Sequence, residues 1–318
     1  MSRFDTSEIE EFKTLLSLSK VGPKTWENSQ NDLGLSREWL LNAKDIWLNE
    51  FQWRTHEERI NSFPNFRMTV EDPIHGEMGV HFVALFSVNP EAILIILMHG
   101  WPGSFLEILP MLELLKAKYT PEGLPYHIII PSLPGYTLSS GPPLGRDFSN
   151  EDSARIMNQL MIDLGFGETG YIAKGGDVGS ALACRMTIHY CKSCPDEARF
   201  KTDDLTETEV GIVQRQMAIA EKFLEWADPR EPVKLDTILA MPFGYSVFLL
   251  ETSILPKSWA KNLHPNMVRY EHEKGGHFGA LEQPQLFLAD VEDFARKMGY
   301  LCKPENDVEM MMTKRRRL

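Results

Sequence analysis

The chain has 318 residues, 43% of them hydrophobic and 25% charged, and a net charge of −12 at neutral pH. This length and composition fit a globular protein with one large α/β domain and an accessory segment, or two small domains. The negative charge argues against nucleic acid and anionic membranes as main partners, because both reward basic patches, and it leaves a small neutral substrate open.

No stretch of the sequence is typical of a membrane anchor or a signal peptide. The longest uninterrupted apolar run, Ala92 to Met98, is far shorter than the roughly 20 residues of a membrane-spanning helix. The polar start of the chain has no signal-peptide pattern, so we expect a cytoplasmic protein. The terminal Arg-Arg-Leu318 is a weak match to the peroxisomal signal Ser-Lys-Leu.

The four cysteines do not make a disulfide framework for a chain of this size. Cys191 and Cys194 have a spacing found in redox and zinc sites, but no second Cys or His pair stands nearby. We therefore expect no metal and no cofactor.

The first third of the chain predicts helices and then paired strands. Residues 1–66 carry apolar side chains at helical spacing and are expected to form an N-terminal helical extension. Phe66–Glu71 and Val80–Phe86 alternate in polarity and predict strands joined by a turn. Ile93–Met98 and His127–Ile130 are wholly apolar or nearly so, as in strands of a parallel sheet covered on both faces.

Helices and strands alternate through the rest of the chain. The spacing predicts helices over Phe105–Lys118, Met157–Leu164, Val178–Tyr190 and Pro284–Lys297, and strands before Asp177, over Gly244–Leu250 and over Met267–Tyr270. This alternation predicts an α/β fold, with a doubly wound, mostly parallel twisted sheet and helices on both faces. We assign the core to residues 67–194 and 242–318. The pattern breaks over residues 195–241, which we interpret as a short helical lid.

The stretch Tyr171–Ser180 joins a buried strand, a turn with glycines at 175, 176 and 179, and a helix start, with Asp177 at the apex. The glycines favour a sharp turn that exposes the central side chain, as in the nucleophile turn of hydrolases. A carboxylate that attacks a saturated carbon leaves an ester that water can cleave, whereas a serine would leave an inert ether. Asp177 therefore predicts an epoxide or an alkyl halide as substrate. The alternative is a glycine-rich turn in which Asp177 only caps a helix.

Cleavage of such an ester needs a base, a group that orients the base, and donors for the oxyanion. Glu251 follows the strand Gly244–Leu250, and His277 lies in a glycine-flanked loop after the last predicted strand. Nucleophile, acid and histidine thus occur in the chain order of hydrolases. His272 is the nearest rival of His277, but it lies too close to the strand end and lacks the flanking glycines.

The turn His99–Ser104 follows a buried strand and is expected to supply the oxyanion hole. The backbone N–H groups of Trp101 and Val178 would point at the developing negative charge. We expect His99 to orient this loop through hydrogen bonds rather than to act as a second base.

These motifs resemble those of epoxide hydrolases of the microsomal type, in the α/β-hydrolase superfamily and in its soluble fungal form. The resemblance covers residues from about 10 to 300, and it implies an α/β-hydrolase fold and a cofactor-independent reaction. In that reaction an ester on Asp177 is hydrolysed to a vicinal diol by water that His277 and Glu251 activate. The matching segments are Phe51–Pro64 in the extension, His99–Pro102, Gly175–Ser180, Phe248–Thr252 and Gly275–Phe278.

The chain departs from this family in the predicted lid. Family lids carry two tyrosines that hydrogen-bond and protonate the epoxide oxygen, but residues 195–241 contain no Tyr and no His. An alkoxide leaving group is far more basic than a tyrosine, so the missing acid matters. Tyr136 follows a strand and is a candidate substrate contact, together with Trp101. We expect weak activity and little contribution from Tyr136 as an acid.

Two other functions stay open from the sequence. A haloalkane dehalogenase also uses Asp, but it usually has Trp and Asn where this chain has Val178 and Trp101. A catalytically impaired hydrolase scaffold would explain the missing tyrosines, although it would have no use for the three catalytic residues. The expected partners are a small hydrophobic epoxide and water, and a homodimer is compatible with this interpretation.

Overall fold

The computed structural model describes residues 4–29, 35–167, 170–190, 243–251 and 267–298. Contacts divide the chain into two compact units, with the boundary between Pro64 and Asn65. The predicted lid, Cys191, Cys194 and the C-terminal Arg-Arg-Leu318 lie outside the described residues. No helix within the described ranges is both long and apolar enough to cross a membrane.

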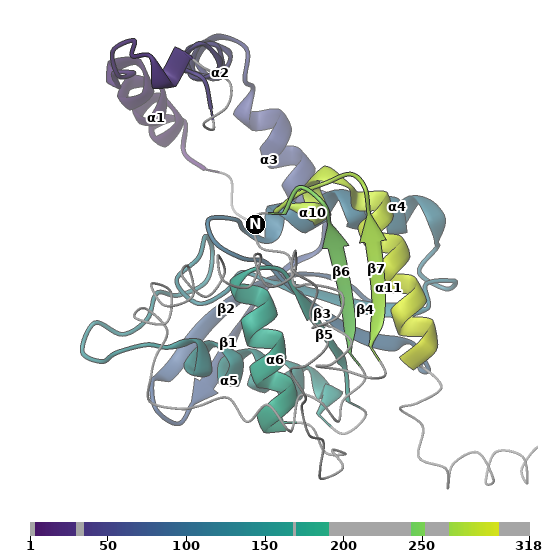
Figure 1. Ribbon diagram of the computed structural model, residues 1–318. Helices are drawn as coiled ribbons and strands as arrows, with labels where there is room; N and C mark the ends of the chain where they lie inside the picture. Colours follow the sequence, from purple (N-terminus) through teal and green to yellow (C-terminus); the bar gives the residue numbers. More distant parts are fainter. Residues whose placement is uncertain (1–3, 30–34, 168–169, 191–242, 252–266, 299–318) are drawn as a thin grey trace, which may run out of the picture. The chain divides into compact units, whose positions relative to one another are not determined.

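The first unit is helical, as the sequence predicts (Figure 1). It contains α1 (Thr6–Leu18), the short 3₁₀ helix η1 (Glu27–Ser29), α2 (Arg37–Asn49) and α3 (Trp53–Asn61). Ser36 caps α2, because its side-chain oxygen accepts the N–H of Trp39 at 3.2 Å and satisfies one of the unpaired donors of the first turn.

The second unit contains a five-stranded sheet with the strand order β1-β2-β4-β3-β5. The pairs β1–β2 and β2–β4 are antiparallel, whereas β4–β3 and β3–β5 are parallel. Two further strands, β6 and β7, form a separate parallel pair. The predicted parallel core is therefore confirmed, with an antiparallel hairpin at one edge. The strands are β1 (Asn65–Asp72), β2 (Gly76–Leu85), β3 (Ile93–Met98), β4 (Tyr126–Pro131), β5 (Ile172–Gly175), β6 (Gly244–Phe248) and β7 (Val268–His272).

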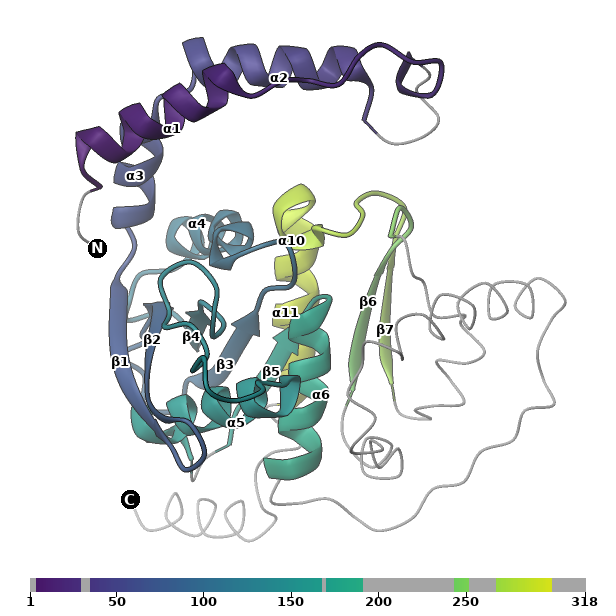
Figure 2. The ribbon, with the colours of Figure 1, turned by 90° about the vertical axis from the view of Figure 1, so that its left-hand side faces the viewer.

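Helices cover both faces of this sheet. Figure 2 shows α5 and α6 together on one side and α4, α10 and α11 together on the other, in agreement with the contacts within each group. The chain thus has the layered arrangement that the alternating pattern predicts. The elements are η2 (Phe105–Ile108), α4 (Leu109–Lys118), α5 (Asn150–Met161), a π-helical turn η3 (Ile162–Phe166), α6 (Val178–Tyr190), α10 (Gly279–Glu282) and α11 (Pro284–Met298).

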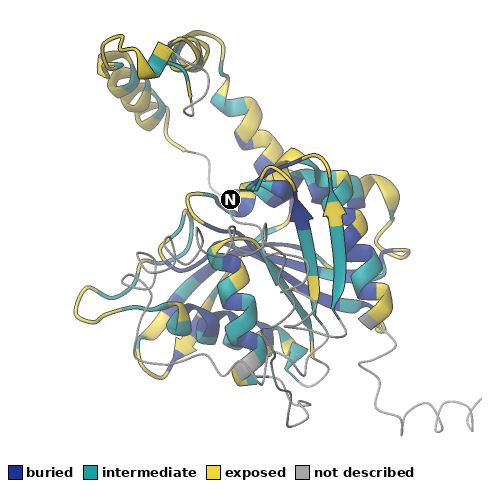
Figure 3. Ribbon diagram, in the orientation of Figure 1, coloured by how far each residue is buried: buried dark blue, intermediate teal, exposed yellow. Residues whose placement is uncertain are grey.

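The buried core lies on both faces of β3 (Figure 3). Ile96 and Met98 belong to a buried cluster that includes Met157 of α5 and Leu182 of α6. Successive side chains of a strand point to opposite faces, so Ile95 and Leu97, at most 1% exposed, are buried on the other face. An apolar run without alternation is what a strand buried on both faces requires.

The sequence placed one helix wrongly. The predicted helix Met157–Leu164 is observed as α5, Asn150–Met161. Its polar first turn is held by a reciprocal pair: the N–H of Ser149 donates to Asp152 at 2.8 Å, and the N–H of Asp152 donates to Ser149 at 3.4 Å. At the other end the helix widens into η3, where Gly165 has a φ of +89°. A capping pair therefore starts the helix before any apolar periodicity is visible.

A partly buried charge cluster connects the end of β1 to α5. We call Asp72, Asp152 and Arg155 the Arg155 cluster. The guanidinium of Arg155 donates to Asp72 at 2.7 Å and to Asp152 at 2.6 Å. Burial raises the pKa of Asp72, but hydrogen bonds from Arg155 and from the backbone N–H groups of His75 and Ile74 outweigh it and hold the pKa below its usual value.

Candidate active site

Asp177 stands on a sharp turn between β5 and α6. Its φ is +49°, a left-handed conformation that costs a non-glycine residue about 1–3 kcal/mol and persists only where the surrounding structure fixes it. A β-carbon on Gly175 would overlap the backbone of Gly179, and one on Gly179 would overlap the carbonyl of Met98. Both glycines are therefore required for close packing under Asp177.

The turn differs in one respect from the prediction. Gly176 has no atom within 4 Å of the position of an added β-carbon, and its φ is not positive. The left-handed conformation falls on Asp177 itself, while Gly175 and Gly179 allow strand and helix to approach each other. Expecting all three glycines to enable the turn was wrong for Gly176.

The loop after β3 supplies a donor to Asp177. The backbone N–H of Trp101 donates to Oδ1 of Asp177 at 2.8 Å. Val178 is the first residue of α6, so its N–H is among those at a helix start that have no partner within the helix. The predicted donor Trp101 is therefore observed on the Asp177 carboxylate, whereas the role of Val178 stays a prediction.

His99 orients this loop through hydrogen bonds, as expected. It is fully buried, its Nε2 accepts the N–H of Leu133 at 3.1 Å, and its Nδ1 lies 3.1 Å from the carbonyl oxygen of Gly100. With Nε2 as acceptor, Nδ1 carries the proton and donates to Gly100. Burial lowers the pKa of His99, so the ring is neutral at pH 7.

His277 lies between the two other predicted catalytic residues. Its Nδ1 is 3.1 Å from Oε1 of Glu251, and its Nε2 is 3.8 Å from Oδ2 of Asp177. The hydrogen bond to Glu251 raises the pKa of His277 against an opposing effect of burial, and the charges of Glu251 and Asp177 raise it further. The structure thus brings Asp177, Glu251 and His277 together at the carboxyl ends of three strands.

The loops that carry Glu251 and His277 are bonded to each other. Beyond the ends of β6 and β7, the N–H of Leu249 donates to the carbonyl of His272 and the N–H of Leu250 to that of Gly275, both at 3.0 Å. A β-carbon on Gly275 would lie 2.7 Å from the ring of Phe248. Gly275, two residues before His277, therefore allows the histidine loop to pack on the buried ring of Phe248.

Glu282 of α10 holds the histidine loop and was missed in the sequence. Its two carboxylate oxygens accept the N–H of Gly276 at 3.0 Å and the N–H of Phe278 at 3.1 Å. These N–H groups flank His277 on both sides, so one carboxylate fixes the backbone that carries the base. A Glu five residues after a loop histidine is the only sequence signal for this contact, and it is weak.

The rival His272 has a structural role. It is the last residue of β7, and its Nε2 lies 2.8 Å from Oδ2 of Asp290, which is 3% exposed. Tyr136 lies closer to the site, with its ring edge-on to His99 at a centroid distance of 4.9 Å. Burial and, to a lesser degree, the charge of Asp177 raise the pKa of Tyr136.

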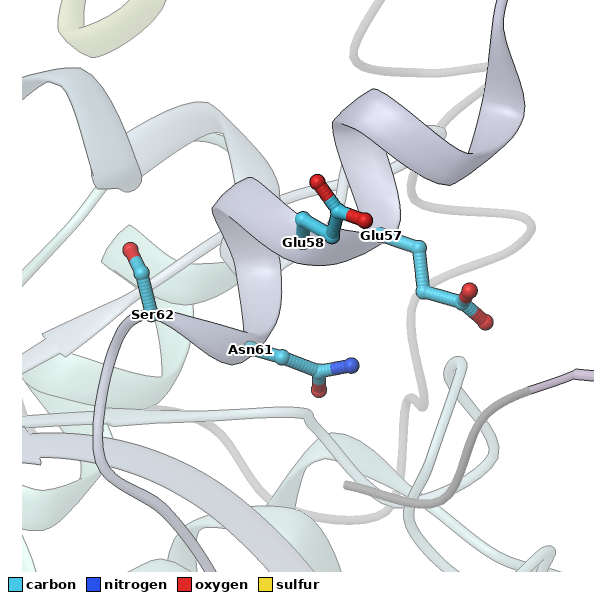
Figure 4. Close-up of a pocket in the computed structure, with 4 residues that line it drawn as sticks. All are labelled: Glu57, Glu58, Asn61 and Ser62. Carbon is cyan, nitrogen blue, oxygen red and sulfur yellow. The ribbon is translucent and has the colours of Figure 1, made fainter.

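A separate hollow lies on α3, in the first unit. Figure 4 shows its four lining residues, Glu57, Glu58, Asn61 and Ser62. Glu57 is already engaged, because it accepts the N–H of Phe4 and the guanidinium of Arg54, both at 2.7 Å. None of the predicted catalytic residues belongs to this hollow.

The fold and the turn at Asp177 define an α/β hydrolase. Residues 93–199 match the family model of the alpha/beta hydrolase fold, and residues 2–108 match the model of the epoxide hydrolase N terminus. The chain is similar to a protein from Dothistroma septosporum named "Putative epoxide hydrolase", at 33% identity over 91% of this chain and 87% of that protein. The chain belongs to the epoxide hydrolase family.

Solved structures agree with this assignment. The epoxide hydrolase of Aspergillus niger has a TM-score of 0.78 and 33% identity, over 93% of this chain and 95% of that one. The juvenile hormone epoxide hydrolase of Bombyx mori, at 18% identity over 95% and 94% of the two chains, shares the fold with a TM-score of 0.74. The aligned length with the Dothistroma protein, 373 residues, exceeds this chain, so that relative has residues without a counterpart here.

Proposed function

We propose that this epoxide hydrolase acts through a covalent ester on Asp177, which a water molecule activated by His277 and Glu251 then cleaves. Family membership supports the overall reaction, in which an epoxide and water give a vicinal diol. The observation that supports this mechanism is that the two carboxylate oxygens of Asp177 have different partners. Its Oδ1 is held by the Trp101 N–H at 2.8 Å, while its Oδ2 faces His277 Nε2 at 3.8 Å.

In the first step, Oδ2 of Asp177 attacks an epoxide carbon. A bond forms between this oxygen and the carbon, the ring C–O bond breaks, and the released alkoxide takes a proton from solvent water. Oδ1 becomes the carbonyl oxygen of the ester and stays on the Trp101 N–H, so the donor is already in place for the second step.

In the second step, Nε2 of His277 takes a proton from water, and the resulting hydroxide attacks the ester carbonyl carbon. Negative charge develops on Oδ1, where the N–H groups of Trp101 and Val178 stabilise it. Glu251 stabilises the imidazolium that forms. Collapse of the intermediate breaks the ester C–O bond, and the proton passes from His277 to the diol oxygen. Asp177 is left as a carboxylic acid and loses its proton to solvent, which balances the proton taken up by the alkoxide in the first step. Because the pKa of His277 is raised above 6.5, this step accelerates as pH rises through that pKa.

The mechanism lacks an identified general acid that would protonate the alkoxide. Residues 195–241, proposed as a shortened lid, contain no Tyr and no His, and the longer aligned relative supports a deletion in this chain. The raised pKa of Tyr136 makes it a poorer proton donor than an ordinary tyrosine. General-acid assistance commonly contributes about 10²–10⁴-fold. We propose weak activity, biased toward epoxides that open with little proton assistance.

The test traps the ester. In His277→Gln, attack by Asp177 continues but hydrolysis lacks its base, so incubation with styrene oxide should give protein plus one substrate by intact mass spectrometry. The matched control is the double variant Asp177→Ala with His277→Gln, which should stay unmodified. An unmodified single variant after long exposure would contradict the ester mechanism.

The same protein separates the remaining alternatives. Diol release from styrene oxide supports the epoxide hydrolase, bromide release from a bromoalkane supports a dehalogenase, and neither supports an impaired scaffold. The proposed substrate is a small hydrophobic epoxide, for which the exposed ring of Trp101 would provide apolar contact. The cytoplasmic location stays a prediction, which cell fractionation would test, and sedimentation would test for the homodimer that the sequence is compatible with.

A further inference from the structure

Glu107 lies directly beneath the turn that contacts Asp177. It belongs to η2, and one of its carboxyl oxygens occupies the space that a β-carbon on Gly103 would need. The carbonyl oxygen of Gly100 is 3.2 Å from the same position, and the N–H of Gly100 donates to the Glu107 carboxyl. The Gly100–Gly103 turn therefore has a carboxyl group seated on its inner side.

Asp177 occupies the other side of the same turn. A β-carbon on Gly100 would lie 2.8 Å from Oδ1 of Asp177, and the next residue, Trp101, donates its N–H to that oxygen. One short backbone segment thus separates the two carboxyl groups. Neither could approach so closely if Gly100 or Gly103 carried a side chain.

The charge on Glu107 depends on its neighbours. Burial raises the pKa of Glu107 to about 7 and the charge of Asp177 adds to this, whereas His277 and the Gly100 N–H lower it. On α10, which packs against η2, the oxygens of Glu282 are occupied by the N–H groups of the histidine loop. His99, on the other side of the loop, is neutral. Asp177 and His277, whose partner is Glu251, are therefore the charges that govern Glu107.

We propose that Glu107 is a positioning residue that holds the Gly100–Gly103 turn and takes on negative charge when Asp177 loses its own. This inference rests on the ester mechanism proposed above. In the free enzyme the charge of Asp177 favours the protonated form of Glu107. When Asp177 becomes a neutral ester, Glu107 releases that proton to bulk water. The Glu107 anion then stabilises the imidazolium that His277 becomes during hydrolysis, and it regains a proton when diol release restores the Asp177 anion.

The first test needs no turnover. Infrared difference spectroscopy of protein with ¹³C-labelled glutamate would follow a Glu carboxyl band that titrates near pH 7 and is absent in Glu107→Gln. In Asp177→Asn, which removes the charge while suiting the left-handed backbone, the midpoint should fall by about one pH unit. A midpoint that does not move would overturn the coupling. This result is independent of whether the trapped ester forms, so failure of the mechanism and failure of this inference are distinguishable.

The second test separates the charge from the position. Glu107→Gln keeps an oxygen for the Gly100 N–H, so in single-turnover experiments ester formation should change little and hydrolysis should slow roughly tenfold, which corresponds to one pKa unit. The midpoint of its hydrolysis pH profile, which His277 sets, should also fall, because the Glu107 anion no longer favours the imidazolium. Glu107→Ala should slow both steps, because the turn loses its support. Glu122→Gln, an exposed carboxylate elsewhere, is the control. Equal rates and equal pH profiles in Glu107→Gln and wild type would overturn the proposal.

Discussion

Two groups of carboxyl groups in the second unit differ in the direction in which their surroundings shift pKa values. In the Arg155 cluster, one guanidinium satisfies two carboxylates, and hydrogen bonds hold the pKa values of both Asp72 and Asp152 below their usual range. At the active site, three carboxyl groups surround one histidine, and the pKa values of Glu107 and His277 are raised. The active-site carboxyls are Glu107, Asp177 and Glu251.

The difference shows how burial and ion pairing decide whether a carboxyl group keeps a fixed charge or changes its charge near pH 7. A carboxylate with a permanent cation beside it stays ionised through any neutral pH and contributes only to stability. A carboxyl group that shares one titratable partner with other carboxyls can change its charge near pH 7, which catalysis needs and stability does not. Mutations in the two groups should therefore have separable effects.

The largest expected effect is on turnover at Asp177. Asp177→Ala removes the nucleophile and should lower kcat at least about 10³-fold, with a melting temperature close to wild type, because its side chain is not packed in the core. Asp72→Ala, the matched carboxylate of the Arg155 cluster, should do the reverse. Diol assays and calorimetry on both variants would check the contrast. Turnover by Asp177→Ala near the wild-type rate would contradict the nucleophile assignment.

Within the Arg155 cluster, removal of the Arg155 guanidinium should lower the free energy of unfolding most. Arg155→Ala leaves the buried carboxylate of Asp72 without its cation and should cost about 2–4 kcal/mol of unfolding free energy. Urea unfolding would measure this, with Arg185→Ala as control, because Arg185 lies 3.8 Å from its partner Glu151.

The same pair of variants gives a pH test. The folded pKa values of Asp72 and Asp152 are below the unfolded value of 3.8. Their contribution is therefore complete above that value and is lost as pH falls through the folded pKa values. Wild type should lose stability below about pH 4 more steeply than Arg155→Ala. Parallel acid curves would indicate that the cluster contributes little.

A smaller effect is expected at Glu282, whose two oxygens hold the backbone on either side of His277. In Glu282→Gln, one oxygen becomes an NH₂ group that cannot accept the N–H of Gly276 or Phe278. Ester hydrolysis should slow roughly tenfold while ester formation is nearly unchanged, since only the second step uses His277. Single-turnover kinetics would show this, with the exposed Glu273→Gln as control. An equal loss in both steps would point to a general disturbance of the fold.

Lys174 is a cation that belongs neither to the Arg155 cluster nor to the active-site carboxyl groups. It donates to Ser246 at 3.0 Å and lies over the ring of Phe287, and burial lowers its pKa to about 8 although Asp290 opposes this. Because its unfolded pKa is 10.5, stability rises with pH between the two values. Lys174→Met should therefore stabilise the protein by about 1–2 kcal/mol at pH 7 and by less at pH 10. Destabilisation at pH 7 would show that the bond to Ser246 outweighs the burial.

The smallest effect is expected at Tyr136. Its hydroxyl is a weak acid because burial raises its pKa, so Tyr136→Phe should change kcat less than about threefold, well below the usual contribution of a general acid. Diol formation from styrene oxide measures this directly. A loss of about a hundredfold would identify Tyr136 as the missing acid.

Elements with strong local signals were predictable from the sequence. Ile93–Met98 and Val178–Tyr190 were expected with the bounds that are observed, because an apolar run bounded by turn residues and a helix after a glycine turn are decided by nearby residues. Asp177, Glu251 and His277 were found because parallel strands bring their carboxyl ends to one edge. Their observed proximity agrees with that reasoning.

The features that the sequence did not reveal depend on contacts between residues far apart in the chain rather than on local sequence patterns. Glu107 is important only because Gly103 lacks a β-carbon that would fill the same volume. Lys174 stands in a segment that was expected to be a buried strand, and nothing nearby indicated that Ser246, 72 residues away, would accept a hydrogen bond from its ammonium group. The helix at Asn150 was placed late because its first turn is polar. These contacts are tertiary, and periodicity does not encode them.

The hydrogen bonds between the loops after β6 and β7 have a consequence for heating. Since Leu249 and Leu250 are bonded to the loop that carries His277, we expect the base and Glu251 to shift as one body on heating and Asp177 to shift with β5. Thermal loosening between these bodies lengthens the gap from His277 to Asp177 and leaves the bond to Glu251 intact. Ester formation does not use that gap, but hydrolysis does. A warmed enzyme should therefore fail with substrate still attached to Asp177, and the burst of ester would outlast steady turnover.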